Sequence, residues 1–323
     1  MTKSSKRLKY IFSVLFLSLF SLVFLNGKVF AAEEVETKLQ ISPVEDRMSL
    51  DPGAVYKNNF TIVNKSEEEK TFEIDVLPFQ VEKETYKPIF NVKNSYTQIT
   101  NWIETEADKY TLEPGEAAII YYTITVPKDA PGGGQYAAIS VTTRNATGDR
   151  QSVSVDASIN YVISARLSGT TRETGEIVDV RASGFLLAPP IKSSVKLTNT
   201  GNVDTAAKIT VDIENAITGA KLYTNSDSPK ESYLLPETEK TVEMQFDNIL
   251  RLGVMRLTMR VEYLDDVQIF NRIVVICPIW FIIIFVSIIV ILVARIMIKK
   301  RENSKKRSNS RGFEKPGNNN FNI

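Results

Sequence analysis

Apolar and polar residues alternate over short runs through most of the chain between residues 37 and 270. In residues 59–64 and 71–76 every second side chain is apolar, which is the period of a half-buried β-strand. Similar runs predict further strands at residues 119–126, 136–142 and 152–159. Turns rich in Pro and Gly separate the runs, and no helical period of useful length interrupts them. The chain is therefore predicted to be all-β, with the strand spacing of a sandwich.

The pattern repeats once along the chain. Four phrases of the first half return in the same order in the second half: 60–64 in 194–201, 72–76 in 208–213, 112–119 in 235–242, and 136–141 in 254–263. A period this long indicates two copies of one domain rather than a solenoid. We predict two tandem Ig-like β-sandwich domains, residues 32–168 and 169–270, joined at the polar, Gly-containing residues 168–175.

One apolar segment, from Ile273 to Val293, breaks this pattern. Its length of about 20 residues is enough for a helix to cross the hydrocarbon core of a bilayer. The basic residues Lys299, Lys300 and Arg301 follow it and act as a stop-transfer signal that stays on the cytoplasmic side. We predict a single C-terminal transmembrane helix over residues 273–294.

The N-terminus combines a basic start, an apolar run over residues 10–25 and small residues at 31–32. This is the pattern of a secretory signal peptide, predicted as residues 1–31 with cleavage after Ala31; the alternative is an uncleaved anchor. Together with the C-terminal span it predicts a single-pass type I protein of the cell membrane. The two domains are then extracellular, and residues 295–323 form a basic, disordered cytoplasmic tail.

Charge and composition exclude several classes of function. The formal net charge is +1, but the basic residues gather at the two ends, leaving about −11 on residues 32–294. Such an acidic exterior is unsuited to nucleic acid. The chain has no histidine and one cysteine, Cys277, so a disulfide framework, a cysteine metal site and a histidine general base are all excluded. We predict that the protein is not an enzyme and that it uses no cofactor or metal.

The remaining candidates for chemistry are weak. Gly132–Gly134 lacks the Lys and helix of a phosphate loop and is interpreted as a turn, and the acidic runs 67–69 and 265–266 lack the spacing of a calcium loop. Paired carboxylates that meet only in space stay open, so a cell-wall hydrolase is kept as a third class of function.

Residues 78–108 are the largest difference between the two repeats and are rich in aromatic side chains. Insertions on a rigid scaffold often carry binding surfaces, so Tyr86, Tyr96 and Trp102 are the candidate ligand surface. Two other interpretations stay open: the insertion adds a hairpin to a sheet, and Trp102 packs in the core.

Several phrases together resemble the WxL-interacting proteins of Gram-positive bacteria. They are LQISP at 39–43, FTIVNKS at 60–66, NWI at 101–103 ahead of LEPG at 112–115, TVPK at 125–128 ahead of Gly-Gly and Tyr136, and YVISARL at 161–167. The resemblance covers nearly the whole chain. It implies a first domain associated with peptidoglycan and a second domain that holds WxL-type surface proteins or host ligands.

These observations predict a membrane-anchored cell-surface adaptor that binds peptidoglycan, exported WxL-type surface proteins, or both, without catalysis. Exposed strand edges can pair with a strand of the partner. The alternative is a structural subunit of a larger membrane or secretion complex, in which the span packs on other helices. Deletion of residues 78–108 is predicted to abolish binding to cell-wall sacculi.

Overall fold

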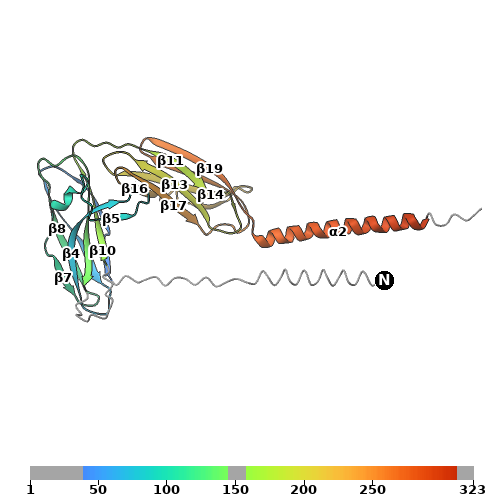
Figure 1. Cartoon of the computed structure of the whole chain (residues 1–323), viewed down its shortest axis with the longest axis horizontal. Helices are drawn as coiled ribbons and strands as arrows, with labels where there is room; N and C mark the ends of the chain where they lie inside the picture. Colours follow the sequence, from blue (N-terminus) through green and yellow to red (C-terminus); the bar gives the residue numbers. More distant parts are fainter. Residues whose placement is uncertain (1–38, 145–157, 311–323) are drawn as a thin grey trace, which may run out of the picture.

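The computed structural model describes residues 39–144 and 158–310, with side chains up to residue 300. The predicted signal peptide, most of the predicted strand at 152–159 and the last part of the tail lie outside these residues. The described chain forms two β-sandwiches followed by one long helix, as Figure 1 shows. This confirms the predicted fold class.

Two sheets pack face to face in the first sandwich. One has the strand order β1-β3-β8-β6 and the other β2-β10-β9-β4-β5, with β7 also pairing with β4. The strands are β1(Leu39–Ser42), β2(Glu45–Leu50), β3(Val55–Asn64), β4(Lys70–Val81), β5(Pro88–Phe90), β6(Ile103–Thr105), β7(Lys109–Leu112), β8(Ala117–Thr125), β9(Gly133–Arg144) and β10(Ser158–Leu167); the short 3-10 helix η2(Gln98–Asn101) precedes β6.

The second sandwich has the same plan with fewer strands. Its sheets have the orders β11-β13-β17 and β12-β19-β18-β14-β15, with β16 also pairing with β14. The strands are β11(Gly175–Ala182), β12(Phe185–Leu186), β13(Ile191–Asn199), β14(Thr205–Asn215), β15(Lys221–Thr224), β16(Lys230–Leu234), β17(Thr238–Phe246), β18(Gly253–Tyr263) and β19(Asp266–Ile276).

The repeated phrases occupy equivalent places in the two sandwiches, and one buried asparagine has the same role in each. The side-chain amide of Asn64 donates to the carbonyls of Glu68 and Leu112. That of Asn199 donates to the carbonyls of Val203 and Leu234. Both asparagines tie the end of a core strand to the turn before the next sheet, because buried backbone carbonyls need a donor. The structure therefore contains two copies of one sandwich type.

Alternation places each apolar phase in a core. In β3 and β8, the side chains that face the core are at most 2% exposed: Phe60, Ile62, Ile120, Tyr122 and Ile124. The residues that alternate with them, Thr61, Tyr121 and Thr123, face outward. Phe60 stacks on Tyr161 with ring centroids 4.4 Å apart, which joins the two sheets of the first sandwich. A second core, mostly of aliphatic and Met side chains with Phe246 and Tyr263, fills the second sandwich.

The apolar segment 273–293 is divided between a strand and a helix. β19 continues to Ile276, and Val274 and Ile276 are fully buried in the second core. The helix α2(Ile279–Ser310) begins only after Cys277 and Pro278. Ile273, predicted to start the membrane anchor, instead pairs with Arg256 of β18. A run of Ile and Val fits a buried strand as well as a membrane span, so the sequence pattern alone does not locate the boundary between β19 and α2.

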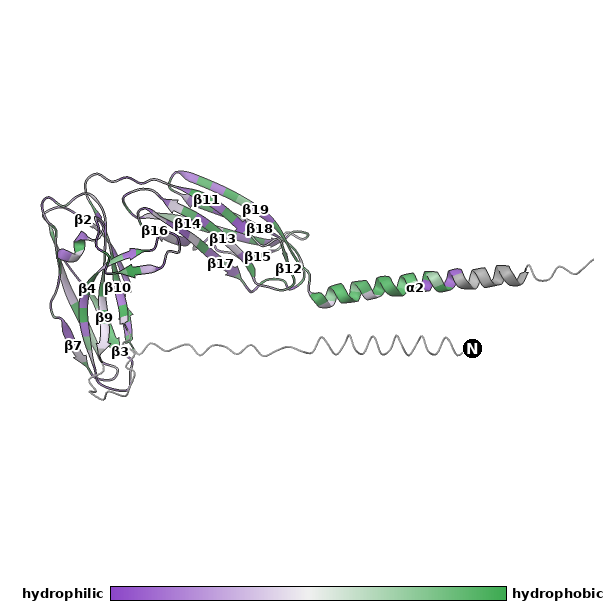
Figure 2. Ribbon diagram, in the orientation of Figure 1, coloured by the Kyte–Doolittle hydropathy of each residue, from purple (hydrophilic) through white to green (hydrophobic). Residues whose placement is uncertain are grey.

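The helix α2 is apolar on all sides up to its basic end, as Figure 2 shows. Residues Ile279–Lys300 form a candidate membrane span of 22 residues. The helix continues to Ser310, whereas the sequence predicts a disordered tail from residue 295 onward. Lys, Arg and Glu are good helix formers, and extending an existing helix needs no new nucleation.

Candidate functional site

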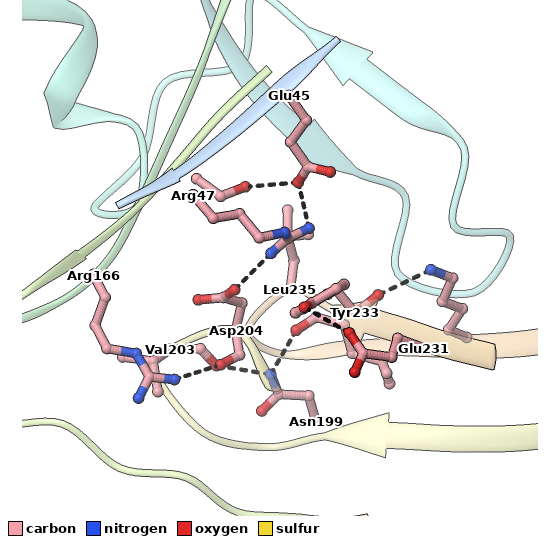
Figure 3. Close-up of polar contacts among 12 residues, drawn as sticks. Glu45, Arg47, Arg166, Asn199, Val203, Asp204, Glu231, Tyr233 and Leu235 are labelled. Atoms are coloured by element: carbon pink, nitrogen blue, oxygen red, sulfur yellow. Dashed lines mark hydrogen bonds and ion pairs between the residues drawn. The ribbon is translucent and has the colours of Figure 1, made fainter. Parts of the chain in front are cut away.

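Charged and aromatic side chains of the two sandwiches meet at the seam between them, which is drawn in Figure 3. Arg47, on β2 of the first sandwich, pairs with the carboxylate of Asp204 in the second at 2.8 Å and with Glu45. Its guanidinium carbon lies 3.6 Å from the ring centroid of Tyr233. Arg166 donates to the backbone carbonyl of Asp204 at 2.8 Å. Charge-assisted bonds and cation–π contact thus join the domains.

Tyr86 also lies at this seam rather than on an open surface. Its hydroxyl donates to the Tyr233 carbonyl at 2.9 Å and accepts from the Leu235 N–H at 3.1 Å. Lys240 places its ammonium 4.4 Å from the centroid of the Tyr86 ring. Burial raises the pKa of Tyr86 to about 12 and lowers that of Lys240. Tyr86 therefore holds the domains together.

The substitution Tyr86→Phe is expected to cost about 1–2 kcal/mol, because the buried N–H of Leu235 loses its acceptor. The raised pKa adds a pH signature. The contribution of the Tyr86 hydroxyl to folding stability is fully present below pH 10, the pKa of an unfolded tyrosine. It is lost as the pH rises through about 12, the pKa in the folded protein. Urea unfolding at pH 7 and across alkaline pH measures both effects. The exposed Tyr223 provides the control Tyr223→Phe; equal behaviour of the two variants would contradict this role.

Tyr96 is the second predicted ligand residue, and it too faces the other domain. Its hydroxyl donates to the Glu237 carboxylate at 2.9 Å, and burial, together with that carboxylate, raises the pKa of Tyr96. A small apolar cluster lies beside it, in which Leu235 of the second sandwich packs on Phe79 and Tyr136 of the first. The seam therefore combines an apolar centre with a polar rim.

Trp102, the third predicted ligand residue, is 9% exposed and packs in the first core. Of the two interpretations of residues 78–108, the added hairpin describes β5, which pairs with β4. Deleting these residues would remove β5, β6 and part of the seam together. Loss of sacculus binding after that deletion would report misfolding, so single substitutions are the better test.

The Gly-rich turn also has a role at the seam. A Cβ added to Gly132 would lie 2.6 Å from the backbone nitrogen of Thr170, and Gly133 has a φ of +130° beside Asn202. The N–H of Gly134 donates to the Asn202 carbonyl at 2.8 Å. Glycine allows the two backbones this close approach.

An exposed aromatic surface, which the sequence analysis expects at residues 78–108, lies elsewhere on the first sandwich. On the outer face of β3, β8 and β6, Ile119 and Tyr121 are 50% and 49% exposed. Tyr121 lies opposite Asn59, and Thr123 lies between Lys57 and Glu104. We call Lys57, Asn59, Glu104, Ile119, Tyr121 and Thr123 the tyrosine face. A hollow of about 520 Å³ lies over part of it, lined by Lys57, Glu104, Tyr121 and Thr123 among others.

The tyrosine face was not found from the sequence, although a signal was present. The run Ile119–Ile120–Tyr121–Tyr122 is apolar in both phases of the alternation, so one phase had to face outward. An exposed ring beside an amide, an ammonium and a carboxylate can pack on the apolar face of a sugar and hydrogen-bond its hydroxyls. The arrangement suits binding of a polar polymer.

The described residues contain no group of three His, Cys, Asp or Glu side chains that could hold a metal ion. In the candidate span, the hydroxyl of Ser287 donates to the Ile283 carbonyl at 2.8 Å, so it is satisfied within its own helix. The predicted stop-transfer residues Lys299 and Lys300 end the span, Arg301 follows in the same helix, and Val293 lies inside it.

No protein-family model and no curated protein matches the sequence. Among solved structures, the class 5 fimbriae chaperone CfaA is similar over 72% of this chain and 98% of its own, with 13% identity and a TM-score of 0.36. The E. coli chaperone DraB is similar over 72% and 96%, with 11% identity and a TM-score of 0.34. A chain of the CsuC–CsuE chaperone–tip adhesion subunit complex of Acinetobacter baumannii is similar over 63% of this chain and 89% of its own, with 12% identity and a TM-score of 0.34. Scores this low support no conclusion about what this chain binds.

Proposed function

We propose that the protein is a non-catalytic adaptor on the outer surface of a Gram-positive bacterium, anchored by α2 and holding cell-wall peptidoglycan, an exported WxL-type protein, or both. The observation that carries this proposal is the junction at Cys277–Pro278. Two residues separate the last core strand from the candidate span, so the sandwiches are held next to a bilayer. The resemblance to WxL-interacting proteins supplies the classes of ligand.

The tyrosine face is the proposed contact with the wall polymer. It lies on the first sandwich, on a sheet that does not include the seam strand β2. A wall polymer on the tyrosine face therefore leaves the contacts between the two sandwiches intact. A glycan is uncharged along much of its length and rich in hydroxyls, which the ring of Tyr121 and the polar groups around it can bind.

The substitution Tyr121→Ala is expected to lower binding to purified Gram-positive sacculi by about tenfold, which corresponds to roughly 1.4 kcal/mol. The side chain is half exposed, so the fold should be retained. Co-sedimentation of the full chain in detergent with sacculi measures the change. The matched control is Tyr223→Ala, on the second sandwich, which should bind as the unsubstituted chain does. Equal binding by the Tyr121 variant would remove the tyrosine face from the proposal.

The structural-subunit alternative depends on contacts made by the span. Removing α2 would then abolish association with the partner, whereas an adaptor that binds through its sandwiches keeps it. Since the Ser287 hydroxyl is satisfied within α2, it does not call for a neighbouring helix.

A further inference from the structure

The last strand of the second sandwich has a long open edge. β19 pairs with β18 along its whole length, from Asp266 opposite Tyr263 to Ile276 opposite Gly253. On its other side, β12 pairs only with Val275 and Ile276. Among the described strands nothing else pairs with that side, so residues 266–274 present an unpaired edge. We call these residues the β19 edge.

The first sandwich shows what closure of this edge looks like. There β10 has the place of β19, and β2 has the place of β12. β2 pairs with six residues of β10, from Val162 to Leu167. The covering strand in the second sandwich is shorter by four residues, so the same fold leaves the edge open there.

The backbone groups of the β19 edge point outward in register. The N–H of Val275 donates to the Gly184 carbonyl at 2.9 Å on the open side. Because ladder bonds alternate along an antiparallel strand, the N–H groups of Val267, Ile269, Asn271 and Ile273 face the same side. An incoming strand can bond to them as β12 bonds to Val275.

The side chains beside these groups are apolar and exposed. Val267, Ile269 and Ile273 are 48%, 62% and 48% exposed. Natural sheets protect open edges with charged side chains, Lys above all, with Pro or with a bulge. Residues 266–274 contain neither Lys nor Pro, and the register with β18 has no bulge. The one cation, Arg272, has its guanidinium beside Gly184, near the end that β12 covers. The rest of the edge is regular and has Val267 and Ile269 exposed, as expected of a surface that receives a strand.

A second copy of this chain in the same membrane does not fit the edge. β19 runs toward α2, so the β19 strands of two anchored copies would run in the same direction. Two copies with parallel β19 strands would be related by a two-fold axis parallel to those strands. That rotation would place the outer face of one copy's sheet beside the core-facing side of the other copy's sheet. Two copies therefore cannot extend one sheet, and the edge suits a different chain.

We propose that the β19 edge binds an extended segment of another exported protein by strand addition. The segment has apolar residues at every second position, to cover Val267, Ile269 and Ile273. It has a basic residue at the end next to the exposed Asp265 and Asp266, by charge complementarity. The proposal rests on the proposed function in that it places the second sandwich outside the cell, and it names the partner class for that domain.

The test uses the full chain in lipid nanodiscs and a displayed library of ten-residue peptides. Enriched peptides should show alternating apolar positions and a basic end. Ile269→Lys should weaken their binding by about tenfold or more, because a lysine blocks the edge. The control Thr210→Lys, on the outer face of β14 two strands away, should leave binding within about twofold.

Amide hydrogen exchange gives the second measurement. The N–H groups of Val267, Ile269 and Asn271 should exchange quickly in the chain alone and about tenfold more slowly with peptide bound. The proposal is overturned if these amides are already protected, if no peptide is enriched, or if enriched peptides bind the Ile269→Lys variant equally well. No step uses sacculi or Tyr121, so failure here is distinct from failure of wall binding.

Discussion

A chain that ends at Arg272 is expected to lose the fold of its second sandwich, whereas a chain that ends at Cys277 is expected to keep it. The four residues Ile273–Ile276 read as membrane anchor in the sequence but complete β19 in the structure. Val274 and Ile276 are fully buried. Removing two such side chains costs at least about 4 kcal/mol, which approaches the whole stability of a typical domain.

Thermal unfolding of the two secreted proteins, starting at residue 32, measures this difference by circular dichroism. The protein that ends at Cys277 is the matched control, because it lacks the same helix and differs by five residues. It should unfold cooperatively, while the shorter protein should show one transition for the first sandwich only. Equal stability of the two would mean that β19 ends earlier than the structure has it.

Arg47→Ala is expected to uncouple the two sandwiches at a cost of about 2–3 kcal/mol. The Asp204 carboxylate, whose side chain is 15% exposed, loses its ion pair, and the ring of Tyr233 loses the guanidinium. A charge left without its partner in a half-buried place accounts for most of the loss.

The control for this substitution is Arg181→Ala. Arg181 also pairs with a carboxylate, that of Asp179, but its side chain is 80% exposed. Exposed pairs contribute about 0–1 kcal/mol. Differential scanning calorimetry should show the single transition of the coupled domains split into two for Arg47→Ala and unchanged for Arg181→Ala. A single, unshifted transition in both would show that Arg47 does not couple the domains.

The strands and their repetition could be predicted because their signals are local. The alternation of apolar and polar residues over 59–64 or 208–213 can be seen from neighbouring positions in the chain. It is required because one face of each sheet is buried in a core and the other faces solvent. The roles of Tyr86 and Tyr96 could not be predicted in this way. Their partners, Tyr233 and Glu237, lie 147 and 141 residues further along, and no spacing rule joins such positions.

The boundary between β19 and α2 was missed for a different reason. Ile and Val serve strands and membrane helices equally, so composition could not divide the run at 273–293. One local signal was available: Pro278, one residue before the helix, cannot continue the strand ladder and favours a helix start. Trp102 was likewise ambiguous, because aromatic residues are frequent both in cores and on binding surfaces.

Wall binding and strand addition both depend on the sandwiches lying outside the membrane and the basic end of α2 inside. Labelling of protoplasts with a membrane-impermeant maleimide tests this most directly. Two single-cysteine chains are compared in a Cys277→Ser background: Ser226→Cys, exposed in the second sandwich, and Ser308→Cys, in the basic end.

The account predicts that Ser226→Cys is labelled on intact protoplasts and that Ser308→Cys is labelled only after lysis. Labelling of Ser226→Cys only after lysis, or of Ser308→Cys on intact protoplasts, would contradict it.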